Sequence, residues 1–185
     1  KEPQNMYEGC NKTALSSQAA IAEALLTLMK EKPYARISVS EICKCAGISR
    51  QTFYTLFASK DNVIAYELER KYCFRPEEHE CCRASMSLED VCHAYSLYIT
   101  QSADILEMLV KNDILYLMQD SLYRTFIDSD CCLSSVSGED RVYAADFIAG
   151  GLTGIARNYV LQGSVSSSRH LESLLYALFN GSFFR

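Results

Sequence analysis

Apolar residues recur every three or four positions in the first part of the chain, which is the spacing of one helix face. The pattern predicts an amphipathic helix that begins after Ser16 or Ser17, because either side chain can cap the first turn. Pro33 ends this helix, since proline has no backbone N–H to continue the ladder. The apolar stripe consists of Ala20, Ile21, Ala24, Leu25 and Leu28.

Two short helices joined by a glycine are predicted next. Ser38 and Glu41 have the three-residue spacing of a capping box. Gly47 supplies the turn, because glycine adopts left-handed backbone geometry at low cost. Ser49 caps the following helix and Ser59 caps one more. A helix, a glycine turn and a second helix that crosses the first form the helix-turn-helix of DNA-binding proteins.

The two short helices also separate a packing face from an exposed face. Small and apolar side chains would fill the space between them: Ile42, Cys43, Ala46, Ile48, Phe53 and Phe57. The polar side chains face outward, and their types form hydrogen bonds with phosphates and base edges. The alternative is a plain helical hairpin with a polar surface, but a hairpin does not require the cap, turn, core and aromatic pair to coincide. We therefore predict a DNA-binding surface made of Ser40, Ser49, Arg50, Gln51, Thr52, Tyr54, Thr55 and Lys60.

The rest of the chain predicts further helices and no sheet. One helix begins near Ser87, with Asp90 three residues later, and the polar stretch 128–140 reads as a loop. The predicted fold class is all-α with about nine helices, in which an N-terminal helix-turn-helix domain (residues 1–60) joins a larger helical domain (residues 61–185). The other expected helices cover about 103–111, 114–127, 141–161 and 169–180.

Composition and charge support this division of the chain. Hydrophobic residues make up 49% of the 185 positions, which is enough to bury a core. The net charge of −5 is uneven, since residues 1–60 carry +3 and the remaining residues −8. This asymmetry indicates a DNA-facing N-terminal part on an acidic body. No apolar run reaches the roughly 20 residues that a membrane span needs, and no signal segment is present, so we expect a cytoplasmic protein.

The cysteines are expected to be reduced and without a metal. An odd number and the lack of a secretion signal argue against a disulfide framework. Zinc sites use paired ligands at spacings such as C-x-x-C, which the chain lacks, although His79 lies close to Cys81 and Cys82. We expect no cofactor. The nine cysteines are Cys10, Cys43, Cys45, Cys73, Cys81, Cys82, Cys92, Cys131 and Cys132.

The stretch "ISVSEICKCAGISRQTFYTLFASKDNVI", residues 37–64, resembles the N-terminal domain of TetR-family transcriptional regulators. A second stretch, "FIAGGLTGIARNYVLQG" (residues 147–163), is similar to a helix near the end of many such regulators. The resemblance implies a homodimer that binds a palindromic operator in double-stranded DNA and usually represses transcription until a small-molecule effector releases it. It places Tyr54 and Lys60 on phosphates and Gln51, Thr52 and Thr55 nearest the bases.

The resemblance also implies that the larger domain binds the effector and dimerises. For the interface we expect the small and apolar residues of the last two helices, namely Phe147, Gly150, Gly151, Gly154, Leu171, Leu174 and Leu178. These stripes would alternatively pack within one subunit, because any amphipathic helix looks alike from periodicity. For the ligand pocket we expect His93, Tyr95, Tyr98, Met108, Tyr116, Tyr123 and Phe126.

Other classes of protein fit less well. The chain has no G-x-S-x-G elbow, Walker loop, G-x-G-x-x-G or H-E-x-x-H, and only three histidines, so we do not expect an enzyme. A purely structural helical protein would have no need of the helix-turn-helix. An alternative within the family is a regulator whose C-terminal domain binds a protein partner in place of a small ligand.

Overall fold

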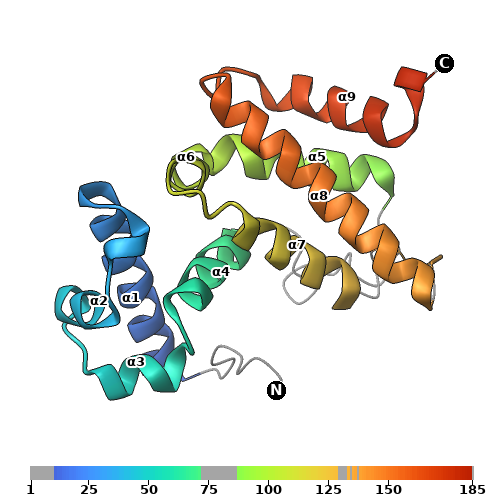
Figure 1. Ribbon diagram of the computed structural model, residues 1–185. Coiled ribbons are helices and arrows are strands. Elements are labelled where there is room, and N and C mark those ends of the chain that lie inside the picture. The colour runs from blue at the N-terminus through green and yellow to red at the C-terminus, as the bar shows by residue number, and fades with distance from the viewer. Residues whose placement is uncertain (1–10, 72–86, 129–132, 134, 137, 185) are drawn as a thin grey trace. The chain divides into compact units, whose positions relative to one another are not determined.

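The structure is a computed structural model that describes residues 11–71, 87–128, 133, 135–136 and 138–184 (Figure 1). Over these residues the chain forms nine α-helices, two short 3-10 helices and no strand, which confirms the all-α prediction. In the same ranges, no helix combines the length and the apolar character that crossing a membrane demands. The chain divides into two compact units, one ending at Arg70 and one beginning at Lys71. The domain boundary expected from sequence, after residue 60, lies ten residues earlier.

The first unit consists of four helices. Their bounds are α1 (Lys12–Glu31), α2 (Val39–Ala46), α3 (Arg50–Leu56) and α4 (Lys60–Lys71), with the 3-10 helix η1 (Tyr34–Arg36) between α1 and α2. Helix α1 packs against α2 and α3. The buried side chains that hold this unit together include Ile21, Leu25, Ile42, Phe53, Phe57, Ile64 and Leu68.

The start of α1 differs from the prediction. The helix begins at Lys12, because Asn11 caps it and accepts a hydrogen bond from the Thr13 backbone N–H at 3.0 Å. Asparagine caps as well as serine does, and the residues between it and Ser16 extend the helix without needing an apolar face. Ser17 lies inside the helix, where its hydroxyl donates to the Thr13 carbonyl.

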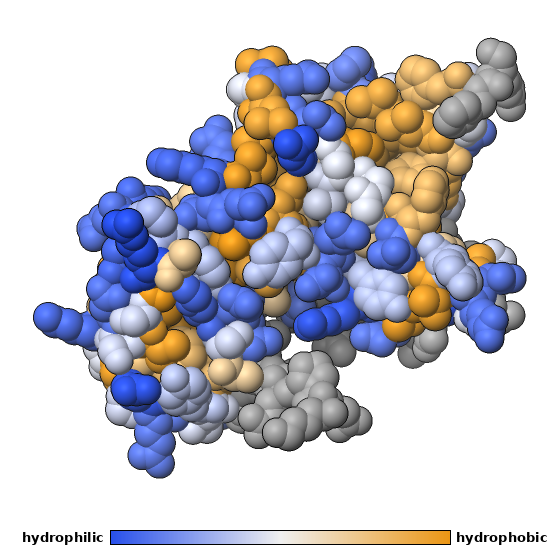
Figure 2. Space-filling view, in the orientation of Figure 1, coloured by the Kyte–Doolittle hydropathy of each residue, from blue (hydrophilic) through white to orange (hydrophobic). Residues whose placement is uncertain are grey.

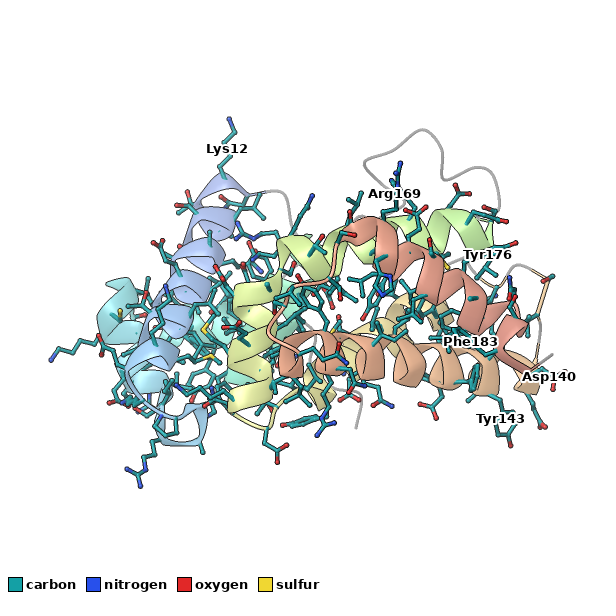
Figure 3. The ribbon with its side chains drawn as sticks, turned by 90° about the horizontal axis from the view of Figure 1, so that it is seen from above. Lys12, Asp140, Tyr143, Arg169, Tyr176 and Phe183 are labelled. Atoms are coloured by element: carbon teal, nitrogen blue, oxygen red, sulfur yellow. The ribbon has the colours of Figure 1, made fainter. Side chains whose placement is uncertain are left out.

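The second unit contains the remaining five α-helices. They are α5 (Leu88–Gln101), α6 (Ala103–Lys111), α7 (Tyr116–Asp128), α8 (Glu139–Leu161) and α9 (Ser168–Phe179), followed by the 3-10 helix η3 (Ser182–Phe184). Each begins within about two residues of the expected position, and the four helices whose ends were also predicted end within about two residues of them. Helix α5 packs on α9, and both α6 and α7 pack on α8. Helix α9 turns back along α8 (Figures 1 and 3).

Candidate nucleic-acid interface

The turn between α2 and α3 is fixed by local hydrogen bonds. The Ser38 hydroxyl accepts from the Glu41 N–H, and the Glu41 carboxylate accepts from the Ser38 N–H, as the capping box predicts. Gly47 has φ 67°, so the chain leaves α2 in the left-handed region that glycine favours. The Ile48 N–H then donates to the Cys43 carbonyl at 3.0 Å. These bonds set the angle at which α3 leaves α2.

Cys43 lies at the crossing of α2 and α3, where the prediction placed it. Its side chain is buried, and its thiol lies 3.9 Å from the Ser49 carbonyl oxygen. Burial raises the pKa of this thiol, because the thiolate would lose its hydration. Cys43 therefore fills space between the helices.

Helix α3 is short, is capped at its start and is anchored by its buried inner side. Ser49 caps it, accepting from the Thr52 N–H at 3.0 Å, and the Thr52 hydroxyl lies 2.9 Å from the Ser49 hydroxyl. On the inner side, Phe53, Leu56 and Phe57 are buried. The inner side anchors the helix, so its outer side is presented in a fixed orientation.

The outer side of α3 carries most of the predicted DNA-binding residues. Arg50, Gln51, Tyr54 and Thr55 are all exposed, and the Tyr54 side chain is 51% exposed. The Arg50 guanidinium carbon lies 5.9 Å from the centre of the Tyr54 ring, a cation–π distance. Ser40 on α2 and the cap residue Ser49 are also exposed, whereas Thr52 is only half-exposed. The four exposed residues of α3 thus make its outer side polar.

Lys60 begins α4 and is more constrained than its sequence position indicates. Its ammonium donates to the carbonyls of Tyr34 (2.7 Å) and Ile37 (3.1 Å) and lies 4.1 Å from the centre of the Tyr34 ring. Burial lowers its pKa. An ammonium has three N–H donors, so the two carbonyls leave one for a phosphate.

Two residues that sequence reasoning did not select complete this arrangement. The Tyr34 hydroxyl donates to the Asp61 carboxylate, and this bond, like the Lys60 contacts, joins η1 to the start of α4. Lys32 forms an ion pair with Glu41, which links the end of α1 to the capping box of α2. Single polar residues in a linker carry no periodic signal, so the sequence could not reveal that these pairs meet.

The expected pocket residues do not form one cluster. Tyr95, Tyr98 and Phe126 are buried, and the rings of Tyr95 and Tyr98 are 5.9 Å apart. His93 is exposed and lies 3.1 Å from the Glu172 carboxylate on α9, so it pairs across the surface of the unit. Tyr116 is 52% exposed. The other two candidates, Met108 and Tyr123, are half-buried.

Several polar groups are nevertheless buried inside the unit. The Tyr95 hydroxyl donates to the Leu152 carbonyl at 2.9 Å, which ties α5 to α8. Ser121 on α7 and Thr153 on α8 are buried, and their hydroxyls have no hydrogen-bond partner among the described residues. Buried polar groups without partners are costly unless a ligand or water satisfies them. In the sequence, Ser121 and Thr153 are each next to a leucine of their own helix. This neighbour was a signal of burial, and the sequence analysis did not use it.

The expected interface residues separate into exposed and interior ones. Phe147 is 74% exposed, Leu178 is 39% exposed, and Gly151 is exposed. Leu171 is only 4% exposed because α9 packs against α5, so this part of the expected interface faces the interior of its own unit. Three of the expected interface residues, Gly150, Gly154 and Leu174, are half-buried.

Three further aromatic residues that the sequence did not single out are exposed on α8, α9 and η3. Tyr143 is 75% exposed, Tyr176 37% and Phe183 60%. All three lie toward the same end of the α8–α9 pair (Figure 3). In Figure 2, apolar residues gather at the upper right of the view, where Figure 1 draws α9. We call the set Tyr143, Phe147, Tyr176, Leu178 and Phe183 the aromatic face.

Over the part of the chain that the structure describes, no three side chains are placed to hold a metal ion. Of the cysteines, Cys43, Cys45 and Cys92 are described, and all three are free thiols. The weak candidate cluster of His79, Cys81 and Cys82 lies outside the described residues.

Comparison with known proteins gives a match to the first unit. Residues 21–66 match the family described as "Bacterial regulatory proteins, tetR family". The transcriptional activator of the dhaKLM operon, DhaS of Lactococcus lactis, is 36% identical over 61 residues, which are 33% of this chain and 33% of DhaS. The transcriptional regulator EthR of Mycobacterium tuberculosis is 43% identical over 53 residues, 29% of this chain and 24% of EthR. The match therefore spans a third or less of these relatives.

The fold similarity extends much further than the sequence similarity. Lin0861 from Listeria innocua superposes with a TM-score of 0.79, covering 98% of this chain and 97% of that protein, at 16% identity. At such identity the likeness concerns the fold alone. Both units, and not only the helix-turn-helix, thus have a counterpart in a solved structure.

Proposed function

We propose that the chain, whose residues 21–66 match the TetR family, is a sequence-specific DNA-binding transcription regulator that represses from a palindromic operator. The observation that carries the proposal is the outer side of α3. Four exposed polar residues stand on a helix that is capped at Ser49 and anchored by Phe53. Because the helix is held in place, its side chains enter a major groove without first being ordered.

The contacts in this proposal fall into two groups. Arg50, Tyr54 and Lys60 bind phosphates and set the position of the protein on the duplex. Gln51 and Thr55 lie on the same outer side and face the bases. Ser40 and Ser49 add hydroxyl groups at the edge of the surface. Phosphate contacts provide affinity, and base contacts provide specificity.

The test is a mobility-shift assay with duplexes taken from beside the protein's own gene. The proposal predicts a shifted band that unlabelled specific duplex competes away and scrambled duplex of the same composition does not. Specific binding should exceed non-specific binding by about 10³-fold or more. Equal competition by both duplexes would refute the proposal.

The proposal includes a homodimer joined through the aromatic face. A two-fold operator requires two recognition helices about 34–36 Å apart, so two copies must be joined. Tyr143 and Phe147 are each about three-quarters exposed, which is unusual for large apolar side chains with no partner surface. Gly151 and Gly154 lie on the same stripe of α8, and their lack of side chains permits close approach of a second helix.

The second unit (residues 71–185) is proposed to bind a small, partly apolar effector. The site would lie where α5, α7 and α8 converge, beside Tyr95 and Tyr98. Ser121 and Thr153 would offer hydroxyl groups that the described protein leaves without partners. Ligand sites in proteins combine mostly apolar walls with a few such polar groups.

The effector is proposed to act through α4, which is the last helix before the second unit in the chain. A ligand shifts a conformational equilibrium only through unequal affinity for the two states. If the effector favours a spacing of the recognition helices that does not fit the operator, then operator DNA must weaken effector binding by the same factor. Once a screen has identified an effector, titrating it with and without operator tests this. Equal affinities would remove the allosteric part of the proposal.

A further inference from the structure

The hydroxyl of Thr55 is already occupied in the free protein. Its Oγ1 donates to the Gln51 carbonyl at 3.0 Å, one turn back along α3. This bond directs the hydroxyl toward the helix backbone and leaves the methyl group as the outward part of an exposed side chain. Thr55 therefore presents an apolar group within a polar surface.

Gln51 is in the opposite situation. Its side chain is exposed, and its amide has no hydrogen-bond partner among the described residues. An amide of this kind can both donate and accept, and it forms the bidentate pair with N6 and N7 of adenine. Gln51 and Thr55 are four residues apart, so they are adjacent on the same face of α3.

The serine and threonine hydroxyls at the start of α3 are committed to its cap. The Thr52 and Ser49 hydroxyls lie 2.9 Å apart, and Ser49 also accepts from the Thr52 N–H. Arg50, whose side chain type pairs best with guanine, has its guanidinium over the Tyr54 ring. On this surface, an unoccupied amide and an outward methyl thus lie together.

Resting on the proposed function, we propose that α3 reads A·T base pairs, with the Gln51 amide on an adenine and the Thr55 methyl on the C5-methyl group of a thymine. The methyl group is the feature by which thymine differs from every other base in the major groove. Residues four apart on a helix are about 6 Å apart, which corresponds to one or two base steps of about 3.4 Å. The adenine and the thymine therefore lie one or two steps apart in each half-site.

The experiment uses the full chain and a random-sequence duplex library, from which bound sites are selected and sequenced. Each thymine of the selected half-site is then replaced, one at a time, by deoxyuridine, which pairs identically but lacks the methyl group. Affinities are measured for the wild type, Thr55→Ser and Thr55→Val. Serine keeps the hydroxyl and loses the methyl, whereas valine keeps a methyl and loses the hydroxyl.

We expect one thymine whose replacement by deoxyuridine weakens wild-type binding about fourfold, as burial of one methyl group predicts. Thr55→Ser should lose the same factor on the normal site and show no further loss on the deoxyuridine site. Thr55→Val should retain the penalty. Gln51→Ala should lose the preference for adenine at one position, a loss of about fivefold or more in discrimination.

Two results would overturn the inference, and they are distinguishable. A selected palindrome in which no thymine methyl matters, or in which Thr55→Ser remains sensitive to deoxyuridine, refutes the base assignment and leaves the regulator intact. A library from which no common sequence is selected refutes the proposed function and the base assignment together.

Discussion

The two units of this chain differ in whether their polar side chains find hydrogen-bond partners, and their large apolar side chains are buried, within the same unit. In the first unit, Ser38, Ser49 and Lys60 all find partners within the unit, and every exposed residue of α3 carries a polar group. In the second unit, Phe147 is 74% exposed and the buried hydroxyl of Thr153 has no partner among the described residues. The surface of α3 therefore rests on side chains that are paired within the first unit, whereas the second unit leaves large apolar side chains exposed.

This difference fits the functions proposed for the units. A surface that reads DNA benefits from being rigid before it binds, since ordering it would reduce affinity. In the proposed function, a second copy would cover the exposed apolar face and a ligand would satisfy the buried hydroxyls. If the comparison is right, changes in the first unit alter DNA binding directly, and changes to the aromatic face alter it through the dimer.

The largest effect is expected from Phe147→Glu. Burying a phenylalanine contributes about 1.5–3 kcal/mol, and a two-fold interface buries it twice, so the dimer should weaken by about 10²- to 10⁴-fold. Sedimentation at micromolar concentration should then show a monomer. The control is Val165→Glu, which alters a side chain that is 81% exposed but lies outside the aromatic face. A Phe147→Glu dimer of normal affinity would show that this face is not the interface.

Gly154→Leu tests the same interface without disturbing the fold. A Cβ atom at Gly154 would meet no atom of the rest of the chain within 4 Å, so the first atom of a side chain has room in the monomer. In the dimer it should block close approach of the helices and weaken association about tenfold. Thermal unfolding of the variant should match that of Gly154→Ala, which serves as the control. An unchanged dimer affinity would remove Gly154 from the interface.

In the first unit, Lys60→Ala and Tyr54→Phe should differ in their salt dependence. Loss of the Lys60 charge should reduce the slope of log affinity against log salt by about 0.9, because one phosphate contact no longer releases a counterion. Tyr54→Phe removes a neutral hydroxyl, so it should weaken binding about threefold to tenfold with an unchanged slope. Fluorescence anisotropy at several salt concentrations gives both quantities. If the slope for Lys60→Ala equals that of the wild type, Lys60 contacts no phosphate and its role is limited to its hydrogen bonds with η1 and Ile37.

The smallest effect concerns the capping box of α2. The hydrogen bond from Lys32, followed by those of Ser38, lowers the pKa of Glu41 from 4.5 to about 2. The folded-state pKa is depressed, so the stabilisation is complete above pH 4.5 and is lost as the pH falls toward 2. Denaturant unfolding between these pH values should show the decline. Glu41→Gln keeps the cap but should lose this part of the pH dependence. If its stability varies with pH as that of the wild type does, Glu41 is not the source of the decline.

The features that the sequence predicted in the two units are local, and those that it did not predict depend on contacts between distant elements. The helices of both units were predictable, because caps such as Ser87 with Asp90 and stripes such as that of α8 are local features. The surface of α3 was predictable for the same reason, since one short helix carries it. The contacts of Lys60 and the burial of Leu171 depend on the packing of elements that are distant in the sequence. The hydrophobic periodicity of a single helix does not reveal such packing. The exposure of Tyr143 likewise follows only from the packing of α8 on α7.

The most direct test of the central claim is the binding of the full chain to its selected operator and to a scrambled duplex, for the wild type and for Gln51→Ala/Thr55→Ala. Both substituted side chains are exposed on α3, so the variant should fold normally. The account predicts that the wild type prefers the operator by about 10³-fold or more and that the variant loses most of this preference while binding the scrambled duplex as before. A variant that keeps the full preference would contradict the claim that α3 reads the DNA sequence.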